Sequence, residues 1–113
     1  SVAYQTYDLF EAMKHDGLRP RLVKVDGGMV MNNWFSQFLS NVVNVGVLRP
    51  KVQETTALGA AFMAGLQIGV YKSLKDISKN WSLDRKFSPK MKNKNRSNLI
   101  KGWSKAIKRT LIN

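Results

Sequence analysis

The chain has 113 residues, of which 43% are hydrophobic, which is enough for one domain with a modest core. It contains no cysteine, which excludes a disulfide framework and thiolate chemistry and fits a cytosolic location. The first residues lack the layout of a signal peptide, and the longest apolar stretch, 57–70, is too short to cross a bilayer. We therefore expect a soluble cytoplasmic protein that does not enter a membrane.

The net charge of +12 is concentrated in one part of the chain. Residues 1–71 include 6 basic and 5 acidic residues, whereas residues 72–113 include 13 basic and 2 acidic residues. Trp81, Phe87 and Trp103 are interleaved with these cations, a combination that can bind nucleic acid. No nucleic-acid-binding module is visible, however, so we interpret 72–113 as a basic helical tail with a solvated lysine-rich surface, and nucleic acid as an unlikely partner.

The first predicted element is a helix over residues 2–15, in which apolar residues recur at helical spacing. Gly17 is placed to end this helix as a left-handed cap. His15 lies in the last predicted turn, without a carboxylate or a nucleophile in a recognisable pattern. We interpret it as a solvated cation near the helix C-terminus rather than a general base.

A strand over 22–25, the pair Gly27–Gly28 and a helix from 32 or 33 to 43 follow. The two glycines permit a tight turn or the close approach of a ligand. The helix N-terminus presents free backbone N–H groups there. We expect the apolar side chains of this helix to face a sheet and its polar ones to face away: Trp34, Phe35, Phe38, Leu39, Val42 and Val43 against Ser36, Gln37, Ser40 and Asn41.

A second short strand at 47–48 begins after Gly46 and is closed by Pro50. A strand, a helix and a strand of these lengths predict a βαβ unit with parallel strands and a right-handed crossover. Two strands do not make a self-sufficient sheet. We therefore expect the helices at 2–15 and 32–43 to expose apolar surface, which favours association.

The rest of the chain is predicted to be helical apart from its connectors. A helix rich in small residues is expected over 56–68, with Thr55 as its N-cap. A short helix over 73–79 would have Ser73 as its cap and Leu74 and Ile77 facing inward. The polar run 90–96 is expected to be exposed and mobile, and a final helix is expected over 97–111.

The sequence by itself offers a place for a ligand but no machinery to transform it. It has no Walker A loop, and its carboxylates outside the basic segment are scattered over different predicted elements. We therefore predict no catalytic residue and no metal ligand in this chain.

Four groups of residues resemble a known family. Asp26 to Trp34, Arg49–Pro50, Glu54 to Ala61 and Gly102 to Arg109 resemble, in order and spacing, the C-terminal part of the glycerol kinases. These enzymes are FGGY carbohydrate kinases, within the superfamily of actin-like ATPases. The resemblance covers essentially the whole chain. It implies an α/β fold, part of an actin-like ATPase (ribonuclease H-like) domain with a βαβα core and flanking helices, and 1–113 as a fragment of the nucleotide-side domain.

The resemblance also implies a reaction and its partners. The whole enzyme would use ATP with Mg²⁺, yield ADP, and phosphorylate glycerol to sn-glycerol 3-phosphate. The catalytic base, the glycerol contacts and the metal ligands would lie in the remainder of the kinase chain, so this segment alone would be inactive. A homo-oligomer is expected.

The family places its adenosine contact on the glycine-rich stretch. By position, Gly28 would back the nucleotide and Asn32 would lie beside the adenine, where an amide offers both a donor and an acceptor. Asp26 and Gly27 are candidates that would mainly shape the turn. Met31 stands where the family usually has alanine, and it would either alter nucleotide affinity or point into the core. The lysine-rich tail also differs from the more acidic tail of the family.

Two other functions remain open. The chain would be an inactive basic fragment that acts only by binding a partner or nucleic acid, or it would be part of a related sugar or polyol kinase.

Overall fold

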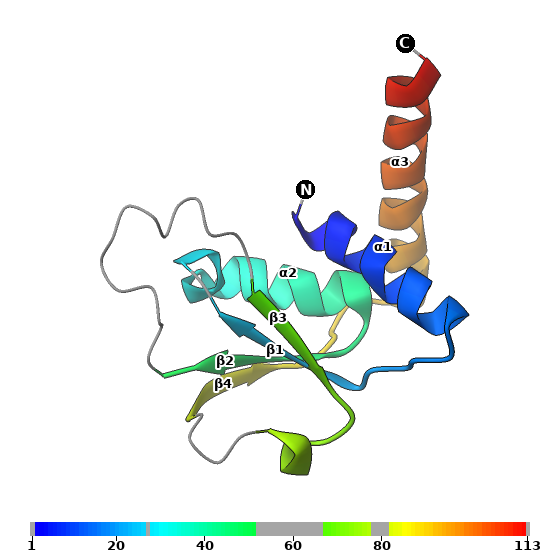
Figure 1. Cartoon of the computed structure of the whole chain (residues 1–113). Coiled ribbons are helices and arrows are strands. Elements are labelled where there is room, and N and C mark those ends of the chain that lie inside the picture. The colour runs from blue at the N-terminus through cyan, green and yellow to red at the C-terminus, as the bar shows by residue number, and fades with distance from the viewer. Residues whose placement is uncertain (1, 27, 52–66, 78–81, 113) are drawn as a thin grey trace.

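A computed structural model describes residues 2–26, 28–51, 67–77 and 82–112. Three α-helices and four strands make up these parts of the chain (Figure 1). In chain order the elements are α1 (Val2–His15), β1 (Leu22–Asp26), the 3₁₀ helix η1 (Gly28–Met31), α2 (Asn33–Val43), β2 (Gly46–Pro50), β3 (Gln67–Tyr71), the 3₁₀ helix η3 (Leu74–Asp76), β4 (Leu83–Phe87) and α3 (Asn93–Ile112).

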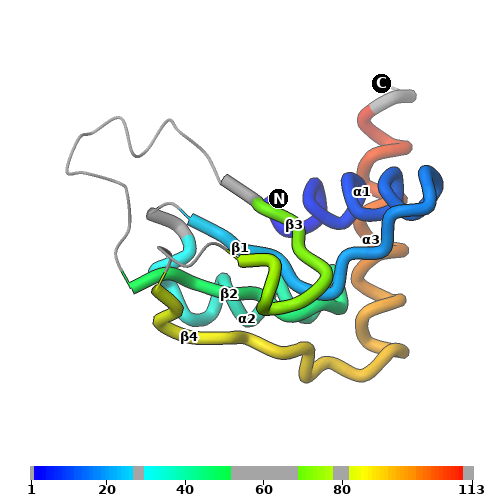
Figure 2. The backbone as a smooth tube through the Cα atoms, turned by 60° about the horizontal axis from the view of Figure 1, so that its bottom comes forward, coloured from blue at the N-terminus to red at the C-terminus, as the bar shows by residue number. Residues whose placement is uncertain are grey.

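The four strands form one sheet in the order β3-β1-β2-β4. Strands β1 and β2 are parallel, with Val23 opposite Val47, and α2 connects them, which confirms the predicted βαβ unit. Strand β3 pairs antiparallel with β1, and β4 pairs antiparallel with β2 (Figure 2). The α/β class and the central unit are therefore as the sequence predicts.

The core lies between the sheet and helices α1 and α2. Alternate residues of the paired strands, Val23 and Val25 of β1 and Val47 of β2, are buried in the same cluster as Leu39 and Val42 of α2. Helix α1 packs across α2 and adds further apolar side chains to this cluster. It ends at His15, which is exposed, and Gly17 has φ +86°, as expected of a left-handed cap.

The orientation predicted for α2 is partly wrong. Ser36 and Ser40 were expected to face away from the sheet but are fully buried, and Trp34 was expected to be buried but is 69% exposed. Ser36 donates a hydrogen bond to the carbonyl of Val30, and the Ser40 hydroxyl lies 2.7 Å from the carbonyl oxygen of Val45. A small hydroxyl lets the helix approach the sheet closely and satisfies a buried carbonyl at the same time.

The sequence did not predict the two outer strands. Gln67 and Ile68 belong to β3 rather than to the end of a helix, and residues 52–66, with the rest of that predicted helix and its cap, lie outside the described residues. Strand β4 occupies part of the segment expected to be a helical tail, 72–113. The described sheet has four strands instead of the two predicted.

Two smaller predictions also need correction. In the described part of the helix expected over 73–79, residues 73–77, Leu74–Asp76 forms a short 3₁₀ turn, and Leu74 is exposed rather than inward. Helix α3 begins at Asn93, so the second half of the run 90–96 is helical. That run is largely exposed as predicted, but Arg96 anchors it by donating hydrogen bonds to the carbonyls of Asn41 and Met91.

Candidate functional site

The glycine-rich stretch forms a short 3₁₀ helix between β1 and α2. Gly28 begins this helix, Met31 ends it, and Asn32 leads into α2. Gly27 lies outside the described residues. The turn follows β1 and therefore stands at the carboxyl end of that strand. Because β1 and β2 are parallel, this is the edge where open α/β sheets bind ligands. Residues 28–31 therefore form a short 3₁₀ helix where the two glycines predicted a tight turn.

Asn32 is the N-cap of α2. It has extended backbone angles, φ −76° and ψ 115°, and its Oδ1 atom accepts a hydrogen bond of 3.2 Å from the backbone N–H of Phe35. Asparagine is among the preferred N-caps because its short side chain reaches this free N–H group. The side chain is exposed, and within the described residues its Nδ2 group has no partner. Asn32 can therefore donate a hydrogen bond to a ligand while it caps the helix.

A buried arginine holds the turn in place. Arg49 of β2 is only 6% exposed, and its Nη1 atom donates to the carbonyls of Val30 and Met31 and to Oδ1 of Asn33, at 3.1, 3.2 and 2.7 Å. Its Nε and Nη2 atoms donate to Oδ2 of Asp84 on β4. One side chain thus connects two strands, the turn and the start of α2.

Two apolar side chains border Asn32 on the surface. Met31 is 55% exposed, so it points away from the core, and Trp34 in the first turn of α2 is exposed too. The Trp34 ring stacks on Phe38 with 5.0 Å between centroids and 7° between planes. Val30, by contrast, is fully buried and attaches the turn to the core. The turn therefore combines an exposed amide with an exposed apolar surface that a flat ring can contact.

The described residues contain no group of three or more histidine, cysteine, aspartate or glutamate side chains that could hold a metal ion. Asp8, Asp16 and Asp26 lie in α1, in the connector after it and at the end of β1, while Glu54 is outside the described residues. Partial burial, with smaller contributions from Glu11 and Asp8, raises the pKa of Tyr7 above its usual value.

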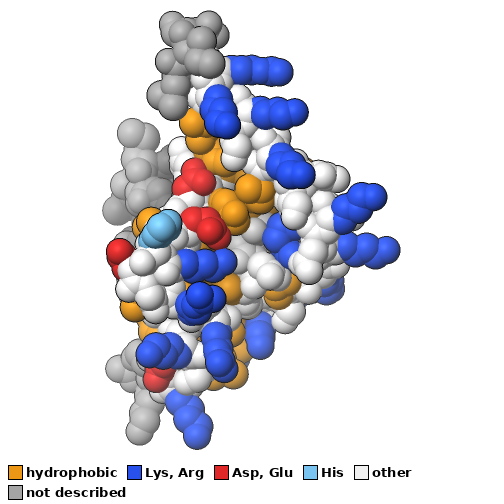
Figure 3. Space-filling view, turned by 90° about the vertical axis from the view of Figure 1, so that its right-hand side faces the viewer, with side chains coloured by type: hydrophobic (Ala, Val, Ile, Leu, Met, Phe, Trp, Pro, Cys, Tyr) orange, Lys and Arg blue, Asp and Glu red, His pale blue; other side chains and the backbone are white. Residues whose placement is uncertain are grey.

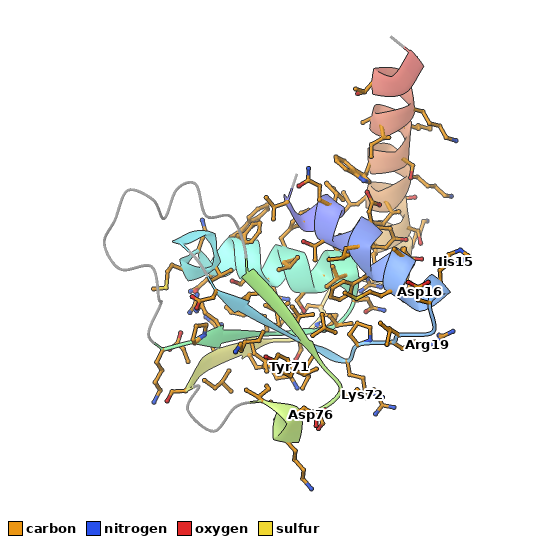
Figure 4. The ribbon with its side chains drawn as sticks, viewed as in Figure 1. His15, Asp16, Arg19, Tyr71, Lys72 and Asp76 are labelled. Carbon is orange, nitrogen blue, oxygen red and sulfur yellow. The ribbon has the colours of Figure 1, made fainter. Side chains whose placement is uncertain are left out.

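A cavity of about 190 Å³ lies elsewhere, next to the start of β1. Its walls come from the end of α1, the connector before β1 and the end of β3, and are formed by Met13, Leu18, Arg19, Pro20, Val70, Tyr71 and Lys72. Figure 4 shows Arg19, Tyr71 and Lys72 in this region. Tyr71 pairs with Leu22, whereas Gln67 pairs with Asp26, so the cavity and the turn are at opposite ends of β1.

The structure places three of the four sequence-predicted site residues, Asp26, Gly28 and Asn32, at this turn. The functional role of these residues remains a prediction. Sequence reasoning missed Arg49 as a structural partner of the turn. An arginine within a strand whose other residues are apolar or glycine was a signal that could have identified it, because a buried guanidinium requires several acceptors.

The chain is similar to known carbohydrate kinases over almost its whole length. Residues 1–68 match the model of the C-terminal domain of the FGGY family of carbohydrate kinases. The chain is 53% identical to a glycerol kinase of Gluconobacter oxydans over 98% of its length, and 52% identical to glycerol kinase 1 of Pseudomonas aeruginosa over 96%. In both comparisons it spans only 22% of the relative.

A solved structure resembles the fold as well. The crystal structure of Plasmodium falciparum glycerol kinase with ADP superposes with a TM-score of 0.72 at 30% sequence identity. The superposition covers 99% of this chain and 23% of that chain. The α/β sheet with its helices therefore matches part of a glycerol kinase, as the sequence predicted.

Proposed function

Since the chain belongs to the FGGY family of carbohydrate kinases, we propose that it is the C-terminal part of an ATP-dependent glycerol kinase. The whole enzyme would transfer the γ-phosphoryl group of Mg-ATP to glycerol, giving sn-glycerol 3-phosphate and ADP. Residues 1–113 would belong to its nucleotide-side domain. The chain shares 53% and 52% sequence identity with two glycerol kinases, which supports glycerol over another sugar or polyol as the acceptor.

Within that enzyme, the turn Gly28–Asn32 would form the adenine side of the ATP site. The observation that carries this proposal is the geometry of Asn32, whose Oδ1 atom caps α2 while its exposed Nδ2 group has no partner among the described residues and can donate to a purine nitrogen. Gly28 would let the nucleotide approach the backbone. Asp26 and Gly27 would shape the turn, and Met31 and Trp34 would contact the edge of the base.

The acceptor and the adenine contact can be tested together in a chimera. This chain replaces the corresponding part of the Gluconobacter oxydans glycerol kinase, and ADP release from Mg-ATP is measured with and without glycerol. We expect turnover that depends on glycerol. Turnover that requires a different polyol would reject glycerol as the acceptor, and a folded chimera without turnover would reject the kinase proposal.

Replacing Asn32 by serine in this chimera should raise the KM for ATP about fivefold to tenfold, because a hydrogen bond worth about 1 kcal/mol is lost. Serine caps a helix about as well as asparagine but has no amide donor. The KM for glycerol and the unfolding temperature should stay unchanged. Asn95→Ser, an exposed position on α3, is the matched control. An unchanged KM for ATP in Asn32→Ser would contradict the adenine contact.

The 113-residue chain alone is expected to release no ADP from Mg-ATP and glycerol above the rate without protein. The described residues offer no metal-binding cluster, and the catalytic base is proposed to lie in the remainder of the kinase. A coupled assay for ADP measures this directly. Glycerol-dependent turnover by the isolated chain would show that the base lies within it.

A further inference from the structure

Four lysines line one face of helix α3. Lys94, Lys101, Lys105 and Lys108 are all exposed. At 100° per residue they fall within about 60° of one another around the helix axis, and at 1.5 Å per residue they extend over about 21 Å. We call these four residues the lysine face. Ser97, Asn98 and Ser104, which are polar and exposed, lie on the same side of the helix or at its margin.

Contacts on the opposite side of α3 determine the direction in which the lysine face points. Trp103 donates from Nε1 to Oδ2 of Asp8 at 2.9 Å and stacks on Tyr4 of α1 with 5.2 Å between ring centroids. Ile100 packs against the core, and Arg96 donates to the carbonyl of Asn41 on α2. The apolar side of α3 up to Trp103 is thus held against α1 and α2, the rest of the helix projects beyond them (Figure 1), and the lysine face lies on the opposite side.

The positive charge of this face is not neutralised within the described residues. The ion pairs found there are Lys14–Glu11 and Arg49–Asp84, and neither includes a residue of the lysine face. Helix α3 itself contains no acidic residue. Lys and Arg side chains accordingly follow α3 along the upper part of the surface in Figure 3. An uncompensated row of cations of this length creates a field that attracts a polyanion.

We propose that the lysine face of α3 binds the phosphate backbone of double-stranded nucleic acid without reading its sequence. This function is separate from phosphoryl transfer and does not depend on it. It revises the interpretation from the sequence alone, in which nucleic acid was an unlikely partner. Lysine, serine and asparagine are side chains that contact phosphates in protein–nucleic acid interfaces. An amphipathic helix that lies in a membrane needs apolar side chains beside its cations, and the apolar residues Ile100 and Trp103 point the other way. The chemistry of the face therefore fits nucleic acid better than a lipid surface.

The proposal is tested by fluorescence anisotropy of a labelled DNA duplex of about 20 base pairs, titrated with the 113-residue chain between about 50 and 200 mM salt. Each phosphate contact contributes about −0.9 to the slope of log affinity against log salt, so four contacts contribute about −3.6. Changing all four residues of the lysine face to glutamine should make the slope less steep by this amount. Between about 50 and 200 mM salt, a slope of about −3.6 lowers the affinity about 150-fold, and we expect the variant to lose this part of the salt dependence.

A matched variant distinguishes binding at the lysine face from an effect of the net charge alone. Lys51, Lys72, Lys75 and Lys86 are exposed and lie off α3, and changing them to glutamine removes the same charge. We expect this control to keep most of the slope, with helicity checked in both variants by circular dichroism. Equal losses in the two variants would overturn the proposal, as would an unchanged slope in the lysine-face variant. Binding to vesicles of phosphatidylglycerol and phosphatidylcholine, without binding to the duplex, would reassign the face to a lipid surface.

Discussion

Replacing Arg49 by methionine is expected to lower the free energy of unfolding by about 2–3 kcal/mol and the unfolding temperature by roughly 10 °C. Methionine fills much of the same space but donates no hydrogen bond. The variant therefore loses the donations to the carbonyls of Val30 and Met31 and to Asn33. Asp84 is 44% exposed in its side chain, so water replaces much of the lost ion pair, and we expect Asp84→Asn to cost less than about 1 kcal/mol. Urea unfolding followed by tryptophan fluorescence measures both variants.

The same contacts predict a specific coupling. The carbonyl of Val30 accepts from Arg49 and also from Ser36, so either single variant leaves it one donor. In the double variant Arg49→Met, Ser36→Ala this buried oxygen loses both donors. The double variant should therefore be destabilised by at least about 1 kcal/mol more than the sum of the two single variants. Additive effects would show that Arg49 does not support the turn through Val30.

Arg49 also links stability to the proposed nucleotide site. In the chimeric kinase, Arg49→Met should raise the KM for ATP because the turn that carries Asn32 loses its attachment to β2. The KM for glycerol should change less. If Arg49 were only a structural residue, the variant would lose active protein on heating but would keep a normal KM for ATP at low temperature.

The parts of the fold that local pattern specifies were predicted correctly. Helix α1 and the β1–α2–β2 unit each depend on residues close together in sequence. The outer strands could not be predicted in the same way. In β4 four of the five residues are exposed and only Phe87 is buried, so the strand lacks the alternation that marks a half-buried one. Its strand conformation follows from pairing with β2, which lies more than 30 residues earlier.

The same distinction between local and long-range signals applies to the candidate site. Gly28 was singled out because a glycine-rich turn after a strand is a local signal, whereas Asn32 was singled out from the family resemblance alone, and the role of both stays a prediction. The role of Arg49 was missed because its acceptors lie 16 to 35 residues away in sequence and come from three different elements. Which carbonyls a buried arginine can reach is decided by strand order and register, and neither is visible in the residues around it.

The hydropathy pattern of α2 predicts that Ser40 faces away from the sheet, whereas the structure buries it. Its hydroxyl lies 2.7 Å from the carbonyl oxygen of Val45 and 3.0 Å from that of Phe87, in a fully buried position. Ser40→Leu should cost about 3 kcal/mol, since the larger side chain overpacks the interface and the buried carbonyl that accepts from the hydroxyl loses its donor. The matched control is Ser104→Leu on the exposed side of α3, which should change stability by less than about 0.5 kcal/mol. Equal stabilities of these two variants would mean that Ser40 faces water, as the hydropathy pattern alone predicts, and that α2 presents a different side to the sheet.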